Sequence, residues 1–275
     1  MKKFLSIAQL IPLFNKWPFH AFARRIDKFL AIDWFNHEVN IVYETCNRDI
    51  KTSWINFARH LNINIIFDTE YTIPRNGPLQ IVSTHRGEFL DIIILGAIIG
   101  PWRTDIKFIA NSDLQSFQLF KEFCFFISAQ MNSSISSYQQ IESHLNKGNA
   151  LCHFAIAWLS IKKNNSKKIK YHKPLGPLPY ILNKNTNTPI LPIKLKFKKT
   201  RRGIIFLYLE EKLLNLSCVK SAKFLAAVDN VFSLRTLRAM QGKTVTVSID
   251  NLITMPPLRL SRAEATQWVA SLILP

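Results

Sequence analysis

One histidine and one aspartate stand close together between two runs of aliphatic residues. The stretch covers residues 79 to 100, LQIVSTHRGEFLDIIILGAIIG, and contains His85 and Asp91. A polar group that is buried alone costs several kcal/mol, so each of these side chains needs a partner, and the simplest partner is the other one. An aspartate that accepts the imidazole N–H fixes the tautomer and leaves the second ring nitrogen free to take a proton from a hydroxyl or an amine. Such a pair would be a general-base dyad.

The spacing of the pair requires a turn between its members. Positions 85 and 91 of a continuous helix would lie on different faces, because successive residues turn by about 100°. We therefore expect a short strand at residues 79 to 83, a polar turn in which Gly87 supplies conformational freedom, and a buried helix that opens near Asp91. The alternative is structural: His85 caps the turn, and Asp91 simply favours a helix N-terminus.

Further elements are predicted on both sides of this stretch. Helices are expected at residues 20–32, 35–46, 51–61, 138–147, 180–183, in part of 219–240, and at the C-terminus up to residue 272 behind a capping box of Ser261 and Glu264. Strands are expected at residues 63–67, 106–110, 189–195, 204–209 and 242–249, with 204–209 pairing with 194–198. A length of 275 residues fits one large α/β domain.

The charge of the chain predicts an anionic partner. Lys and Arg number 36 against 18 Asp and Glu, and residues 143 to 209 contain no acidic residue at all. The choice is nucleic acid or an anionic membrane. The 20 Phe and 6 Trp favour the membrane, and no zinc spacing, arginine-rich tract or nucleic-acid module is visible, so no nucleic acid is expected. We expect residues 162 to 173 to form a basic loop.

The N-terminus and the cysteines bear on location. Apolar residues recur at helical spacing from Phe4 to Phe14, and this stripe faces either the core or a membrane interface; we favour interfacial contact for residues 2 to 30. The segment lacks a signal-peptide cleavage site, and no apolar run reaches the length of about 18 to 20 residues that a membrane span needs. Four scattered cysteines without a CxxC pair fit a reducing compartment. We expect a cytoplasmic protein, peripheral on the inner face of the membrane.

The stretch around His85 resembles a known family. The run His85-Arg86-Gly87-Glu88-Phe89-Leu90-Asp91 is similar to the first motif of the lysophospholipid acyltransferase (PlsC-type glycerolipid acyltransferase) superfamily. The match is to the His-Pro-x-Gly-x-x-Asp form of its bacterial hemolysin-like, or lyso-ornithine-lipid acyltransferase, branch, with Arg86 in place of Pro. Residues 73–78, IPRNGP, resemble the Ile-Pro-x-x-Gly-Pro that precedes this motif.

The resemblance covers about residues 26 to 255 and implies a fold. That fold is an α/β structure with a mixed central sheet flanked by helices on both faces, as in glycerolipid acyltransferases. Residues 1–62 would form a helical N-terminal segment, for which we expect contact with the membrane. Residues 63–275 would form a single compact acyltransferase-like domain.

The same resemblance implies a set of site residues. His85 would be the general base and Asp91 its orienting partner. The residues implied in substrate binding lie in or near the four motifs: Arg86, Gly87, Asn111, Ser112, Phe154, Trp158 and Pro192. Asn111 has a simpler interpretation as a structural residue at a helix cap.

The third motif departs from the family. Phe-Pro-x-Gly-Glu is expected near residue 154, but Ala155 stands for Pro, Ala157 for Gly and Trp158 for Glu. An indole can neither carry the charge of that Glu nor accept a hydrogen bond. Trp158 packs against an acyl chain or a flat acceptor, or it fills the core. Either the acceptor differs from the usual glycerolipid, or catalysis has been lost.

The resemblance thus implies a membrane-associated enzyme. It would move a fatty acyl group from a thioester donor, acyl-CoA or acyl-carrier protein, to a hydroxyl or amine of a lipid-like acceptor. No metal and no cofactor beyond that co-substrate are expected. The phosphates of coenzyme A, or of a carrier's pantetheine arm, compete with the bilayer as partners of the basic stretch. The alternative function is that of a catalytically silent lipid-binding relative.

Overall fold

A computed structural model describes residues 25, 31–46, 50–68, 70–85, 89–111, 115, 121–127, 135–162, 168–174, 176–197, 234–235, 237–257 and 259–274. Within these ranges the strands are β1 (Asn64–Phe67), β2 (Leu79–His85), β3 (Lys107–Asn111), β4 (Cys124–Ile127), β5 (Ala150–Lys162), β6 (Lys168–Pro174), β7 (Ile190–Phe197) and β8 (Thr244–Ile249). The helices in the same ranges include α3 (Ile32–Thr45), α4 (Ile50–His60), α5 (Phe89–Ile99), α6 (Ile135–Asn146), α7 (Leu178–Thr186) and α10 (Arg262–Ser271).

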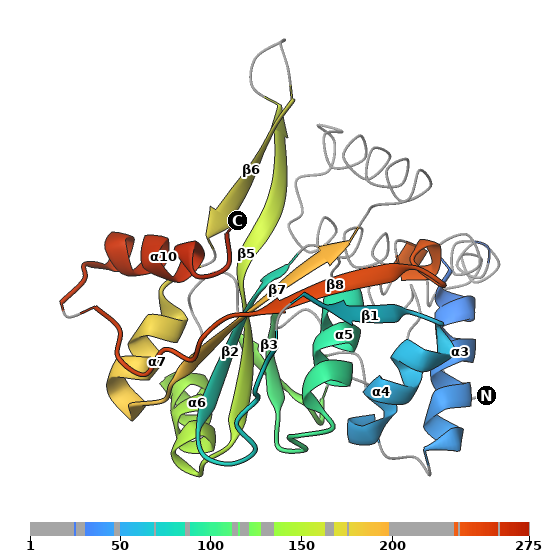
Figure 1. Ribbon diagram of the computed structural model, residues 1–275, viewed down its shortest axis with the longest axis horizontal. Coiled ribbons are helices and arrows are strands. Elements are labelled where there is room, and N and C mark those ends of the chain that lie inside the picture. The colour runs from blue at the N-terminus through green and yellow to red at the C-terminus, as the bar shows by residue number, and fades with distance from the viewer. Residues whose placement is uncertain are drawn as a thin grey trace, which may run out of the picture.

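The described strands form one mixed, eight-stranded sheet (Figure 1). Its order is β1-β8-β7-β2-β5-β3-β4, and β6 pairs with β5 outside this row. Neighbours from β7 through β2, β5 and β3 to β4 are parallel, whereas β8 runs antiparallel to β7 and β6 antiparallel to β5. The parallel strands therefore end at one common edge of the sheet, the edge at which open α/β sheets usually carry their sites.

Helices cover both faces of this sheet, as alternate residues of β2 show. Leu79 and Ile81 pack into an apolar cluster with residues of α3, α4 and α5. Val82 points to the opposite face and packs with Tyr180 of α7 and Val269 of α10. Successive strand residues face opposite sides, so the two clusters lie on the two faces. The predicted α/β architecture, a mixed sheet flanked by helices, is confirmed.

The helix after β2 is the most deeply buried one. Ten of the 11 residues of α5 are buried, which fits a helix that is apolar on every side. Gly96 lets α4 approach closely, because a Cβ at this position would lie 2.8 Å from Cβ and Cγ of Trp54. Glu38 of α3 pairs with His60 of α4, and both helices share the apolar cluster of α5 and the sheet.

Most predicted elements within the described residues are confirmed. The helices near 35–46, 51–61 and 138–147, the strands near 63–67, 106–110 and 242–249, and the capping box at Ser261 are all present. The interfacial helix predicted for residues 2–30 lies outside the described residues apart from Arg25, and so do the strand predicted at 204–209 and nearly all of the helix predicted within 219–240.

The basic loop predicted for residues 162 to 173 is wrong at residue 162 and at residues 168–173, whereas residues 163–167 lie outside the described residues. Lys162 ends β5, and residues 168–174 form β6, paired in register with residues 156–162. Lysine suggests a solvated loop, but strand alternation accepts a lysine at every second position as long as the other positions are apolar.

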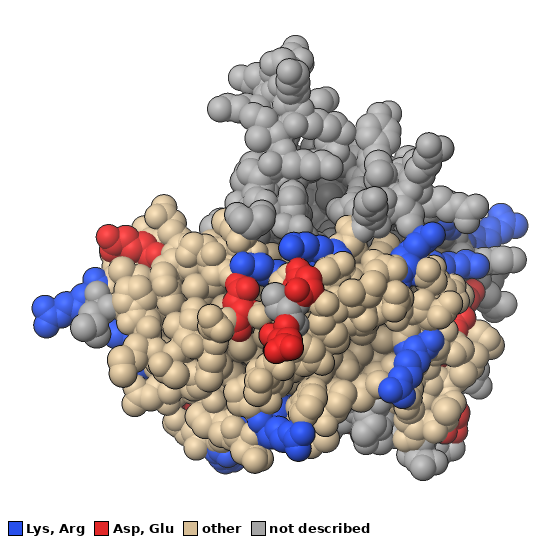
Figure 2. Space-filling view, in the orientation of Figure 1, with Lys and Arg blue, Asp and Glu red and all other residues tan. Residues whose placement is uncertain are grey.

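Residues 143–209, which we call the acid-free stretch, contain no acidic residue, but the fold places carboxylates from other parts of the chain beside two of their lysines. Lys194 forms an ion pair with Asp250 at 2.7 Å, and Lys196 lies 3.6 Å from Asp68. Figure 2 shows basic and acidic side chains side by side on this face of the molecule. Among the described residues, no helix is both long and apolar enough to cross a membrane.

Candidate active site

The two predicted catalytic residues lie at the ends of consecutive elements. His85 is the last residue of β2, a central strand with β5 on one side and β7 on the other. Asp91 lies in the first turn of α5. The predicted strand and the predicted helix are thus both present. The side chain of His85 and residues 86–88 are not among those that the structure describes, so the contact between His85 and Asp91 stays a prediction.

Asp91 is fully buried, with 0% of its surface exposed. Burial and, after it, the negative charge of Asp91 raise the pKa of the Cys152 thiol on β5. The carboxylate therefore lies close to the sheet, on the face that α5 covers. A helix N-terminus favours a carboxylate, but an aspartate that serves only this purpose has no reason to leave water. The burial of Asp91 favours a role beyond helix capping.

Ser83 is a buried polar residue that the sequence did not single out. It shows 0% exposure, and its Oγ has no hydrogen-bond partner among the described residues. It lies between Phe154 of β5 and Ile193 of β7 in the sheet. The one available signal was a pair of adjacent hydroxyl residues, Ser83 and Thr84, directly before His85. A small polar group thus lies on the α5 face directly before the end of β2.

Phe154 and Trp158 lie beside β2 on its neighbour β5. Phe154 is the register partner of Ser83, and its ring stacks on that of Phe108 with centroids 6.4 Å apart. Ala157 is the register partner of His85, so the backbone of Trp158 lies one residue beyond the end of β2. The fold brings this segment next to the proposed dyad, whereas the position of the indole is not described.

The remaining predicted contacts are more scattered. Asn111 ends β3 at the same edge of the sheet as His85, but β5 lies between the two strands. Pro192 is buried and is the register partner of Val82, which places it on the α7 and α10 face, opposite Asp91. Arg86, Gly87 and Ser112 lie outside the described residues. The substrate contacts of these residues stay predictions.

Other titratable side chains near β2 are unsuited to the chemistry. Burial lowers the pKa of His153 to about 3, and this residue lies opposite Val82 on the face away from Asp91. Burial also raises the pKa of Cys124 and of Cys152, so both thiols stay protonated at neutral pH and are poor nucleophiles. No group of three His, Cys, Asp or Glu side chains in the described ranges has the arrangement of a metal site.

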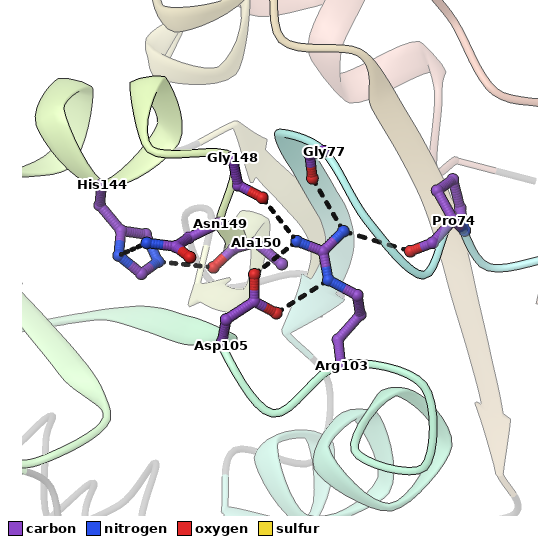
Figure 3. Close-up of polar contacts among 8 residues, drawn as sticks. All are labelled: Pro74, Gly77, Arg103, Asp105, His144, Gly148, Asn149 and Ala150. Carbon is purple, nitrogen blue, oxygen red and sulfur yellow. Dashed lines mark hydrogen bonds and ion pairs between the residues drawn. The ribbon is translucent and has the colours of Figure 1, made fainter.

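A second polar cluster lies at the opposite edge of the sheet (Figure 3). Arg103, which is 2% exposed, holds Asp105 through two hydrogen bonds and donates to the carbonyls of Pro74, Gly77 and Gly148. These carbonyls belong to the connections before β2 and before β5. Burial acts to raise the pKa of Asp105, but the hydrogen bonds and charge of Arg103 outweigh it and the net shift is downward. The cluster joins three connections and is structural.

Comparisons with known proteins add a likeness of structure. No protein-family model matches the chain, and no curated protein matches it. The structure is similar to the crystal structure of the 1-acyl-sn-glycerophosphate (LPA) acyltransferase PlsC from Thermotoga maritima, with a TM-score of 0.43 and 13% sequence identity over 82% of this chain and 75% of that chain. A TM-score this low carries no argument about function.

Proposed function

We propose that this chain is a membrane-associated acyltransferase with His85 as general base and Asp91 as its orienting partner. The observation that supports this proposal best is the fully buried Asp91 in the first turn of α5, directly after a central parallel strand that ends at His85. The motif resemblance of residues 85–91 agrees with it. The membrane-contacting segment would lie within residues 1–62 ahead of α3, since α3 and α4 pack against α5 and the sheet, and residues 63–275 would form the catalytic domain.

The reaction follows from the roles of the two residues. His85 takes the proton of an acceptor hydroxyl or amine while its oxygen or nitrogen attacks the carbonyl carbon of an acyl thioester. Asp91 orients the imidazole and stabilises the imidazolium that forms. When the tetrahedral intermediate collapses, the carbon–sulfur bond breaks and the thiolate takes the proton back from His85. The products are an ester or amide and a free thiol, so neither a metal nor a further cofactor is required.

The partners follow from the same chemistry. The donor is a fatty acyl thioester, on coenzyme A or on an acyl-carrier protein, and the acceptor is lipid-like. The basic composition of residues 143–209 favours work at an anionic surface, the inner face of the cytoplasmic membrane. No nucleic acid is proposed as a partner.

A second candidate function rests on Trp158. The Glu expected at this place is absent, which favours a silent relative that binds acyl lipids without transferring the chain.

One assay separates the two candidates. Full-length protein is incubated with labelled fatty acyl-CoA or acyl-carrier protein and a panel of lysolipids and lipoamino acids, and products are identified by mass spectrometry. An enzyme forms an acylated acceptor and free thiol in equal amounts. A silent relative binds the acyl lipid, for example in a fluorescence titration, and forms no product with any acceptor.

A further inference from the structure

The strand next to the proposed site continues beyond the sheet. The pairing of β5 with β2 ends where Ala157 meets His85. The pairing with β6 begins at Ile156 and Pro174 and continues to Lys162 and Lys168. Figure 1 shows the two strands rising together out of the sheet. We name residues 156–162 and 168–174 the β5–β6 ribbon.

The register sorts the residues of the ribbon onto two unlike faces. Cross-strand partners share a face, and successive residues alternate. Leu159 pairs with Tyr171, and Ile161 pairs with Ile169; these four positions make the apolar face. The pairs between them make the basic face: Trp158 with His172, Ser160 with Lys170, and Lys162 with Lys168.

The apolar face begins at the proposed site. Ala157 is two residues before Leu159, so it belongs to the same face, and it is also the register partner of His85. At the base of this face Lys173 pairs with Ala157. A row of positions that are apolar apart from Lys173 therefore leads away from the end of β2.

A ribbon of this kind needs a partner. Two strands alone are at best marginally stable in water, and a row of apolar positions on one face of a ribbon favours a contact on that face. Among the described helices α10 contacts the ribbon. The ribbon contributes four lysines and stands within a stretch of the chain that has no acidic residue, so its partner must offer both an apolar layer and negative charge.

We propose that the β5–β6 ribbon docks on an anionic lipid bilayer. The apolar face enters the boundary between headgroups and acyl chains, and the lysines lie at the level of the lipid phosphates. An acidic carrier protein would match the lysines and leave the apolar face unused, so the bilayer is favoured. Docking would place the end of β2 at the membrane surface; only this consequence rests on the proposed acyltransferase function.

Vesicle co-sedimentation of the full-length protein tests the proposal. Vesicles of phosphatidylcholine with and without phosphatidylglycerol are compared for wild type, for Ile161→Ser with Ile169→Ser, and for Lys168→Gln with Lys170→Gln. We expect each double variant to bind anionic vesicles at least about tenfold more weakly than wild type. The matched controls Ile181→Ser and Lys184→Gln change an exposed residue of each type on α7 and should bind like wild type. Thermal unfolding confirms that each variant is folded.

Hydrogen–deuterium exchange of the wild type gives a second readout that needs no variant. Amides of residues 156–162 and 168–174 should gain protection on anionic vesicles. Three results would overturn the proposal: no vesicle binding, vesicle binding without protection of these amides, or protection by an acidic carrier protein in place of vesicles. His85→Ala should bind vesicles like wild type, so failure of the catalytic proposal is seen separately as missing acyl transfer with intact docking.

Discussion

At the scale of single residues, a carboxylate without solvent contact is the feature that most needs an explanation. The free energy needed to move an ionised group out of water is far larger than the stabilisation that a helix N-terminus provides, which is about 0.3–1 kcal/mol at a surface. Asp91 is 0% exposed and lies close enough to Cys152 for its charge to raise the pKa of that thiol. A catalytic partner for His85 accounts for keeping such a group.

Trp158 carries the first prediction at this scale. If the chain is an active acyltransferase, its acceptor is not a standard phosphate-bearing lysolipid, because the Glu that organises that site in the family is replaced by an indole. Trp158→Glu should leave transfer to the native acceptor unchanged or lower. Mass spectrometry of products across the acceptor panel measures this. Efficient wild-type transfer to lysophosphatidic acid, lost in His85→Ala, would refute it.

His153 carries a prediction about pH. Burial lowers its pKa from 6.5 to about 3 in the folded protein, so below pH 6.5 the unfolded chain binds one proton more than the folded one. The stability that His153 contributes is complete above its unfolded pKa and is lost as the pH falls. At pH 5 the loss relative to pH 7 should be about 2 kcal/mol, because one pKa unit corresponds to about 1.4 kcal/mol.

Urea unfolding at pH 7 and pH 5 checks this expectation. His153→Leu should remove that part of the pH dependence, whereas the wild type should keep it. Equal pH dependence in both proteins would show that His153 does not titrate in this way.

At the scale of elements, long apolar segments were predictable and contacts between connections were not. Residues 79–100 predicted a buried strand and a buried helix because most residues of both segments are apolar. The Arg103 cluster could not be predicted, since three of its partners are backbone carbonyls at Pro74, Gly77 and Gly148, which have no sequence signature. The β5–β6 ribbon was missed because its lysines and the neighbouring Asn and Ser residues suggest a loop.

Arg103 carries the prediction for this scale. Arg103→Met keeps the aliphatic stem but removes every donor to Asp105 and to the three carbonyls. Breaking a buried charged pair in this way typically costs about 3–5 kcal/mol, because the remaining groups are left uncompensated. The free energy of unfolding in urea measures the loss. Arg59→Met, at an exposed position of α4, is the control and should change stability by less than about 0.5 kcal/mol. A variant at Arg103 within about 1 kcal/mol of wild type would contradict the structural role.

At the scale of the whole molecule, the charge is distributed by the fold and not by the sequence alone. Lys194 and Lys196 belong to the acid-free stretch, yet Asp250 and Asp68 arrive beside them from distant parts of the chain. Four lysines of the same stretch lie in the β5–β6 ribbon. Net charge predicted an anionic partner; the element proposed to meet it could be named only from strand pairing.

The site shows the same division between what sequence and structure supply. His85 and Asp91 were predictable because their residue types and spacing are unusual in an apolar stretch. The position of Pro192 on the opposite face was not predictable, because the sequence alone does not say which face of a strand packs against a given helix. Ser83 was missed because a single serine in a strand has no distinctive pattern.

The most direct test of the central claim is the initial rate of acyl transfer by wild type, His85→Ala and Asp91→Asn under identical conditions. His60→Ala, which removes a histidine–carboxylate pair between α3 and α4, serves as the matched control, with circular dichroism as the check on folding. We predict measurable transfer by wild type and His60→Ala and a loss of about 10²–10⁴-fold in both site variants, the usual contribution of a general base. Equal rates for wild type and His85→Ala would contradict the claim.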